Sequence, residues 1–304
     1  MTLDRRQLNA FLAVCEYRTL GMASQKLNLT QPALSRTIRL LETEVGVPLF
    51  ERHPLGMEMT AYARALRPYA ERLVSEGRRA FEEIRAMRNL RKGYVRIGAV
   101  TSVASSVVPL ALQRLLRRLP GLEADIVEDL GDRLRVELSK GTIDVVIAGE
   151  IGVQDSDEFI TRTPLTKDTW SIFARTGHPC FADRKLELGE LLAYPWVTLP
   201  LGHPMHEPLR DIFRASGIEP PKPTISTRSI SAMRSLVATG DFISCMPKTM
   251  VAWELRHASI RSALAPEQMW KRQLFLYLRR NGQVSLATKA LIGDLQSAVE
   301  QEDL

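Results

Sequence analysis

Amide, hydroxyl and guanidinium side chains recur at helical spacing in the segment TQPALSRTIRLLE, residues 30–42. Gln31, Ser35 and Arg39 form one stripe, with Pro32 and Arg36 beside it. Positions four apart lie on one face of an α-helix, so these groups would project together. Gln can pair with adenine, Arg with guanine or phosphate, and Ser with either. The combination predicts a helix that reads base edges in a DNA groove.

The start and the opposite face of this helix are also marked. Thr30 is a suitable N-cap, and Pro32 fits the first turn, where its missing N–H is not needed. The free N–H groups of that turn can hold a phosphate. Leu34, Ile38 and Leu41 lie on another side of the helix and predict a buried face.

Two shorter helices are expected before this one. Leu8, Phe11 and Cys15 share one apolar face of the first helix, and a second helix is predicted over about 20–27. A short connection then leads into the third helix. A helix that packs across a preceding helix, with its polar groups outward, is the arrangement of a helix-turn-helix.

A small hairpin is predicted after the third helix, in the segment VPLFERHPLGMEMT, residues 47–60. Leu49 and Phe50 are expected to pack inward, and residues 54–56 supply turn chemistry. Such a hairpin is a wing, and Arg52 on it could reach the DNA backbone or the minor groove. The alternative for Arg52 or Arg39 alone is a solvated surface charge.

The charge of the chain is unevenly divided. Residues 1–92 contain 16 Lys and Arg against 10 Asp and Glu, whereas residues 93–304 contain 25 of each. A basic module joined to a neutral body indicates that the front of the chain meets a polyanion.

The stretch LNAFLAVCEYRTLGMASQKLNLTQPALSRTIRLLETEVGVPLFER, residues 8–52, resembles the N-terminal signature of LysR-type transcriptional regulators. The resemblance is dense over about 60 residues and implies a winged helix-turn-helix over residues 1–60. Tyr62 takes the place of a small residue in the family's pattern after the wing. The expected DNA-contacting residues are Thr30, Gln31, Pro32, Ser35, Arg36, Arg39 and Arg52.

A long helix is predicted over residues 61–92. Its apolar and small residues follow a heptad spacing that is typical of a coiled coil. They are Leu66, Ala70, Leu73, Gly77, Ala80, Ile84 and Met87. A dimer through this seam would present two recognition helices to a palindromic DNA site. The resemblance implies the same dimer and, commonly, a tetramer. The alternative is an amphipathic helix that lies on the body.

Strands and helices alternate through residues 93–304, which predicts an α/β domain with a parallel sheet. The pattern makes two similar units. It resembles the LysR-type effector domain, a fold of two subdomains like that of periplasmic solute-binding proteins. By resemblance, subdomain I covers about 94–164 and 268–304, and subdomain II covers about 165–267. The effector would bind between them.

Several polar residues stand where strands end and helices begin, as in ligand clefts of α/β folds. The candidate effector-binding residues are Thr101, Ser102, Asp132, Thr198, His203, Ser229, Ile230 and Ser231. The alternative for each is plain helix capping. Asp132 stands where the family often has a small hydroxyl residue, and its carboxylate would repel a simple anion. Arg133 and Arg228 could restore an anion site, so the effector class stays open between an organic acid and a sugar derivative or cationic ligand.

No enzyme motif, cofactor motif or metal-ligand pattern is recognisable in the sequence. His203 and His206 are spaced for a metal, but prolines interrupt the segment and no further ligand completes a site. Three distant cysteines suit a reducing cytoplasm. No apolar run reaches the roughly 18 residues needed to span a membrane.

The sequence therefore predicts a cytoplasmic LysR-type regulator, a homodimer or homotetramer that binds a palindromic promoter site in double-stranded DNA. A small effector would modulate it, with no cofactor and no catalysis. Two other hypotheses remain: a solute-binding-like sensor whose main output is not transcription, and an enzyme fused to a DNA-binding module.

Overall fold

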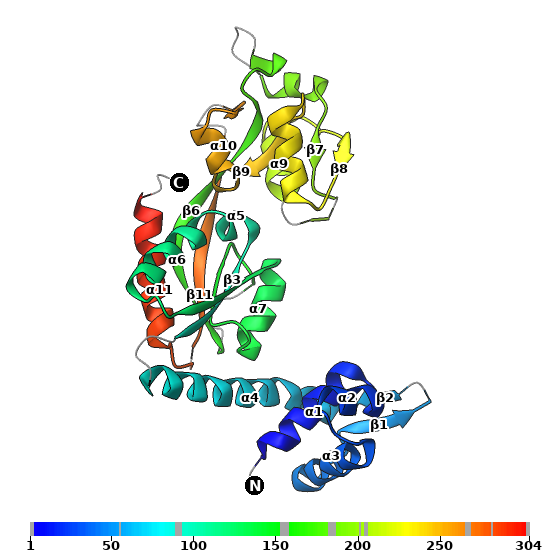
Figure 1. The fold of residues 1–304 in the computed structure, drawn as a ribbon. Coiled ribbons are helices and arrows are strands. Elements are labelled where there is room, and N and C mark those ends of the chain that lie inside the picture. Colours follow the sequence, from blue (N-terminus) through cyan, green and yellow to red (C-terminus); the bar gives the residue numbers. More distant parts are fainter. Residues whose placement is uncertain are drawn as a thin grey trace.

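The computed structural model describes residues 3–54, 56–88, 93–152, 158–181, 187–200, 202–203, 206–264, 269–280 and 282–301. Figure 1 shows three parts: an N-terminal module, the long helix α4, and a body with two lobes. No helix among the described residues is both long and apolar enough to cross a membrane.

The N-terminal module is a three-helix unit with a hairpin. Its elements are α1 (Arg5–Tyr17), α2 (Leu20–Lys26), α3 (Gln31–Val45), β1 (Phe50–His53) and β2 (Gly56–Met59). Asp4, Thr19 and Thr30 cap the three helices with their side chains, as short polar residues do at N-caps. Gly46 ends α3 in the left-handed conformation that glycine tolerates. The predicted winged helix-turn-helix is thus confirmed.

Helix α4 (Ala61–Arg88) begins against this module. The Thr60 hydroxyl accepts a hydrogen bond from the Ala63 N–H at 3.2 Å and so caps the helix. Tyr62 points away, with 55% of its surface exposed, so it does not disturb the packing there.

The heptad seam predicted for α4 needs a correction. Ala70 is fully buried in the core of the N-terminal module, and Leu66 packs against the same core. Leu73 and Ile84 are exposed instead, together with Tyr69 and Phe81. The first part of the predicted seam faces the chain's own helices because the apolar surface of α4 is wider than one stripe.

Subdomain I is built on parallel strands β4 (Glu123–Glu128), β3 (Tyr94–Ala99) and β5 (Val145–Ala148), with β11 (Trp270–Arg279) antiparallel beside β5. Its helices are α5 (Thr101–Ala104), α6 (Val107–Arg118), α7 (Gly131–Lys140) and α11 (Leu286–Gln301). Helices α6 and α11 pack together over one core, while Leu134 and Leu138 of α7 fill another.

Subdomain II repeats this plan with shorter strands. Parallel β8 (Ile225–Ser226) and β7 (Val197–Thr198) lead through a bridge from Trp196 to Ile243 to β9 (Ser244–Pro247), and β6 (Ile160–Arg175) runs antiparallel to β9. Strand β10 (Ile260–Ser262) pairs with the far end of β6. The helices are α8 (Glu207–Ala215), α9 (Ile230–Thr239), α10 (Ala252–Arg256) and the 3₁₀ helices η1 (Pro179–Phe181), η2 (Leu188–Ala193) and η4 (Lys248–Val251).

The predicted parallel sheet is thus found in β4, β3 and β5, whereas the sheet as a whole is mixed. Strands β6 and β11 run antiparallel to each other and span both lobes, as Figure 1 shows. Each crosses directly from one subdomain into the other without the helical crossover that a parallel connection needs. The chain passes from subdomain I to subdomain II along β6 and returns along β11.

Candidate DNA-binding and effector-binding sites

The polar stripe of α3 lies on the surface of the N-terminal module. Thr30, Gln31, Pro32, Arg36 and Arg39 are exposed, and Ser35 is half-buried. The opposite face, with Leu34, Ile38 and Leu41, is buried in the module core. Burial of one face fixes the helix and leaves the amide and guanidinium groups outward. A helix of this kind can enter the major groove with its N-terminal residues against base edges.

The wing arginine and the helix meet at one side chain. Ser35 Oγ accepts hydrogen bonds from Arg39 Nη2 at 3.3 Å and from Arg52 Nη2 at 3.4 Å. Arg52 alternates with Glu51 along β1, so the two side chains leave opposite faces of the hairpin. Glu51 pairs directly across the hairpin with Glu58. Only the Arg52 face therefore suits contact with phosphate.

Glu42 fixes the wing to α3, a role that the sequence did not reveal. Its Oε1 accepts hydrogen bonds from the backbone N–H groups of Leu49 at 2.8 Å and Phe50 at 3.2 Å. Behind the hairpin, the N–H of Met57 donates to the Arg18 carbonyl at 2.7 Å. A Cβ at Gly56 would stand 2.4 Å from that carbonyl oxygen, so only glycine fits this approach.

The candidate effector residues of subdomain I differ in how accessible they are. Thr101 Oγ1 donates to Glu128 Oε1 at 2.7 Å, and both residues lie where strands β3 and β4 end. Asp132 is exposed in the first turn of α7. Ser102 is only 1% exposed, and its hydroxyl faces the interior.

The candidate effector residues of subdomain II also differ in how accessible they are. Ser229 caps α9 through the Ala232 N–H at 3.2 Å, and Ser231 beside it is exposed, while Ile230 is half-buried. Thr198 is buried and donates to the Leu199 carbonyl at 3.0 Å. Burial and the nearby positive charge of His206 and Arg228 lower the pKa of His203.

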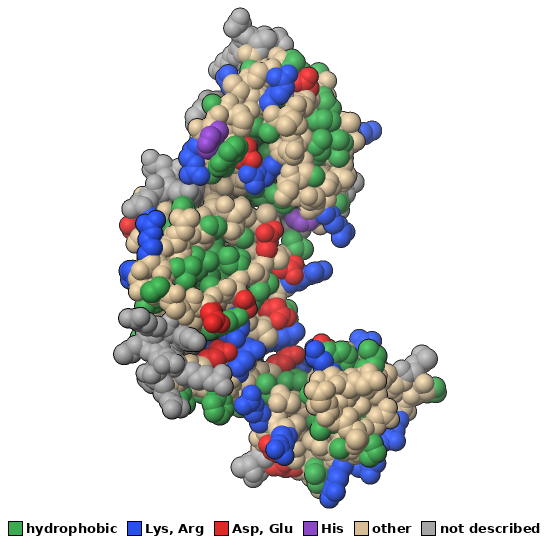
Figure 2. Space-filling view, viewed as in Figure 1, with side chains coloured by type: hydrophobic (Ala, Val, Ile, Leu, Met, Phe, Trp, Pro, Cys, Tyr) green, Lys and Arg blue, Asp and Glu red, His purple; other side chains and the backbone are tan. Residues whose placement is uncertain are grey.

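The two sides of the junction between the subdomains differ in charge. Figure 2 shows acidic side chains on the subdomain I side and a histidine with basic side chains on the subdomain II side. Glu128, Asp129 and Asp132 supply acid at the ends of β4 and the start of α7. Arg133 is paired with Asp129 at 3.6 Å, which offsets only one of these carboxylates.

A polar network at the junction was missed in the sequence. Arg272 of β11 donates through Nη2 to Ser102 Oγ at 3.2 Å and to Asp168 Oδ2 at 2.9 Å. Thr249 Oγ1 donates to Asp168 Oδ1 at 3.0 Å. Burial raises the pKa of Asp168. The charge of Arg272 and the hydrogen bonds from Arg272, Thr249 and Ser102 lower it, but by less than burial raises it. Several charged residues stand in each of these two strands, so the sequence did not single out Asp168 and Arg272.

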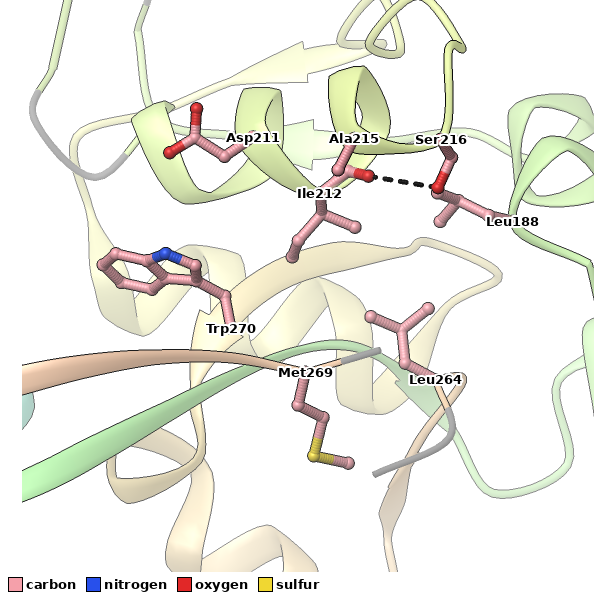
Figure 3. Close-up of a pocket in the computed structure, with 8 residues that line it drawn as sticks. All are labelled: Leu188, Asp211, Ile212, Ala215, Ser216, Leu264, Met269 and Trp270. Carbon is pink, nitrogen blue, oxygen red and sulfur yellow. Dashed lines mark hydrogen bonds between the residues drawn. The ribbon is translucent and has the colours of Figure 1, made fainter. Parts of the chain in front are cut away.

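A separate hollow of about 320 Å³ lies in subdomain II, outside the predicted cleft (Figure 3). Leu188, Ile212, Leu264 and Trp270 form most of its apolar wall, with Asp211 and Ser216 at its edge. None of the predicted effector residues lines it.

All three cysteines are buried and free. Burial raises the pKa of Cys15 and of Cys245 to about 12, and that of Cys180 to about 11. A reactive thiol needs the opposite, a lowered pKa and exposure. Within the described residues, no group of three or more His, Cys, Asp or Glu could hold a metal ion.

The architecture defines a class: a winged helix-turn-helix joined by a long helix to a ligand-binding fold of two subdomains. Residues 5–64 match the family of bacterial regulatory helix-turn-helix proteins, lysR family, and residues 88–300 match the LysR substrate binding domain. The chain therefore belongs to the LysR family and is a DNA-binding transcriptional regulator with an effector-binding domain.

Individual proteins agree with this assignment. The chain is 30% identical to the SDS degradation transcriptional activation protein of Pseudomonas sp. (strain ATCC 19151), over 95% of this chain and 94% of that protein. It is 29% identical to a probable hydrogen peroxide-inducible genes activator of Mycobacterium leprae (strain TN), over 86% of this chain and 82% of that protein. Full-length CbnR complexed with its target DNA has a TM-score of 0.67 and 20% identity, covering 97% of this chain and 100% of that chain.

Proposed function

We propose that the regulator binds a palindromic promoter site as a homodimer, with one α3 helix of each protomer in the major groove. The contacting residues would be Thr30, Gln31, Pro32, Ser35, Arg36, Arg39 and Arg52. The exposed polar face of α3, which Arg52 of the wing joins at Ser35, carries this proposal. Phosphate contacts by the arginines would supply affinity, and base edges would supply sequence preference.

Exposed apolar side chains support self-association through α4. Tyr69, Leu73, Phe81 and Ile84 are each more than half exposed on this one helix. Several large apolar side chains exposed along one helix favour a protein interface there. The edge strand β4, which exposes Ile126 on one face and Val127 on the other, supports a further contact that would build a tetramer.

The effector would bind between the subdomains at Thr101, Asp132, Thr198, His203, Ser229, Ile230 and Ser231, with Ser102 behind them. The opposed charges at this junction favour a small ligand with both an acidic group and hydrogen-bond donors. The acidic group would face His203 and Arg228, and the donors would face Glu128 and Asp132. A hydroxy acid or a sugar acid has this chemistry. We place the protein in the cytoplasm, where its DNA is.

The buried thiols argue against a peroxide-sensing mechanism like that implied by the name of the Mycobacterium leprae relative. Their raised pKa values keep them protonated at neutral pH, whereas the thiolate is the form that reacts. Ligand binding is therefore the proposed control.

The DNA part is tested on duplexes selected from a random pool by the wild-type protein. Arg36→Ala should weaken binding by about fivefold or more, because a good base contact contributes about 1–3 kcal/mol. Arg133→Ala is the matched control, since Arg133 is exposed and lies on α7 of the body. Equal losses in both variants, or no loss in Arg36→Ala, would contradict the assignment of α3.

The effector part is tested by thermal shift with matched compounds: gluconate against glucose, and lactate against propionate. A ligand of the native state raises the melting temperature, and at equal concentration the tighter ligand raises it more. The proposal expects the hydroxy acid of each pair to stabilise most, and His203→Ala to remove that difference. Equal shifts within both pairs would refute the hydroxy-acid class.

A further inference from the structure

Four polar side chains connect the two subdomains across the crossing strands. Ser102 stands on α5 of subdomain I, Asp168 and Arg272 on β6 and β11, and Thr249 on η4 of subdomain II. Arg272 donates hydrogen bonds to Ser102 at 3.2 Å and to Asp168 at 2.9 Å. Thr249 donates to Asp168 at 3.0 Å. One continuous chain of hydrogen bonds therefore joins both lobes.

The network is buried apart from Arg272, whose side chain is 21% exposed. Asp168 is fully buried, and Ser102 and Thr249 are 1% and 4% exposed. Arg272 lies over the Trp170 ring at 5.3 Å, and Gly149 leaves room for its methylene groups, since a Cβ there would stand 3.0 Å from Arg272 Cδ. These contacts fix the position of the Arg272 guanidinium.

This arrangement is a poor way to gain stability alone. A buried ion pair must recover the cost of removing both charges from water, and it does so only with complete hydrogen bonding. Arg272 Nε is buried and has no hydrogen-bond partner within the described part of the chain. An apolar pair of similar volume would be at least as stable. The network is therefore better explained by the geometry that it imposes.

We propose that this network sets the relative position of the two subdomains, and that Asp168 and Arg272 are positioning residues for the effector site. The inference rests on the proposed function, because the position matters only if the effector binds between the lobes. Thr101 precedes Ser102 on α5 and is bonded to Glu128, so a shift of the network moves the site. Ser102 acts through Arg272 and not as a surface contact.

The test compares two double variants that each replace an ion pair with apolar residues. Asp168→Leu with Arg272→Met removes the network pair. Arg234→Met with Glu254→Leu is the matched control, because this pair, at 2.6 Å, joins α9 to α10 within subdomain II. Both variants should fold, since apolar replacement of a buried pair is often neutral or stabilising.

The readout is the distance between the lobes, measured by pulsed electron spin resonance on full-length protein. Spin labels are placed at Val136→Cys on α7 and Thr239→Cys on α9, both exposed, while the native cysteines are buried. Labelled protein is diluted with unlabelled protein so that only distances within one protomer are read.

The network variant should move the most probable distance by more than about 2 Å, the scale of a domain rearrangement, or clearly broaden its distribution. The control variant should match the wild type. Identical distributions in all three proteins would overturn the proposal. If the network variant does not fold, the same distance is measured in Ser102→Ala and Thr249→Ala. Each of these variants removes one hydroxyl of the network, and an unchanged distance in both would overturn the proposal. Failure to bind DNA would count against the proposed function and leave this result intact.

Discussion

Helix α4 is held by two different kinds of contact along its length. Its first half packs into the N-terminal module through apolar groups: Ala63 and Ala70 are fully buried, and Leu66 and Val74 lie against the same core as Phe11 of α1. This contact depends on the fit of volumes, as in any close-packed core.

The second half of α4 is held on subdomain I by polar groups. Ser75 Oγ donates to the Gly141 carbonyl at 2.5 Å, and Arg79 Nε lies 3.4 Å from Asp144 Oδ1. Farther along, Glu82 accepts two hydrogen bonds from Arg96, at 2.7 and 3.1 Å. Gly141 is required there, because a Cβ would stand 2.5 Å from Ser75 Oγ.

The difference indicates where the molecule can adjust. The apolar contact makes the start of α4 part of the DNA-binding module. Its strength should not change with salt concentration. The polar contact depends on charge, so acid should weaken it, and high salt should weaken the partly exposed Glu82–Arg96 pair more than the buried Arg79–Asp144 pair. Movement between the DNA-binding module and the effector domain is therefore expected at the second half of α4.

The largest effect is expected from Arg79→Met. This change leaves Asp144 buried with less compensation, and breaking a buried pair typically costs about 3 kcal/mol or more. Arg133→Met is the control, because its pair with Asp129 is exposed and exposed pairs contribute about 0–1 kcal/mol. Chemical denaturation measures both, and equal costs would mean that the polar contact is not buried as described.

Ala70→Leu should cost somewhat less, about 1–3 kcal/mol, because it inserts atoms into a filled core. Ala65→Leu on the exposed side of the same helix should change the free energy of unfolding by about 0.5 kcal/mol or less. The cost of Ala70→Leu should not vary with salt. A cost of Ala70→Leu that changes with salt would contradict the distinction between an apolar first half and a polar second half of α4.

Acid should weaken the second half of α4 selectively. Burial alone would raise the pKa of Glu82, but the hydrogen bonds from Arg96, together with the positive charges of Arg96, Arg78 and Arg79, outweigh burial and lower it. A lowered folded pKa adds stability above the ordinary value of 4.5, and this stability is lost as pH falls through the folded pKa. The stability difference between wild type and Glu82→Gln should therefore shrink below about pH 4.5. A constant difference would refute this role.

The smallest effect concerns the thiol of Cys15, which is buried beside α4. Burial raises its pKa to about 12, so alkylation at pH 8 should be slow until α4 separates from α1. Ala70→Leu should accelerate alkylation of Cys15, detected by mass spectrometry of its peptide, whereas Arg79→Met should not. Equal acceleration in both would mean that the halves open together.

The N-terminal module could be predicted closely from sequence because its signals are local. The N-cap at Thr30 and the spacing of Leu34, Ile38 and Leu41 act within a few residues of their helix. The hydrogen bond from the wing to Glu42 was not predicted, because it depends on where the hairpin folds back against α3.

The body was less predictable because its contacts join distant segments. Asp168 and Arg272 are 104 residues apart, and only the antiparallel register of β6 and β11 makes them partners. The same crossing strands add the antiparallel pairs that the parallel-sheet prediction did not include. The seam of α4 failed in part because periodicity cannot distinguish a face that meets another protomer from one that meets its own module.

Hydrogen–deuterium exchange of α4 in low and high salt tests the comparison most directly. Amide exchange reports local opening along the helix. The account predicts faster exchange over residues 75–84 in 1 M NaCl, where charges are screened within about 3 Å, and unchanged exchange over residues 61–74. Equal acceleration along the whole helix, or none in either half, would contradict the division of α4 into an apolar and a polar contact.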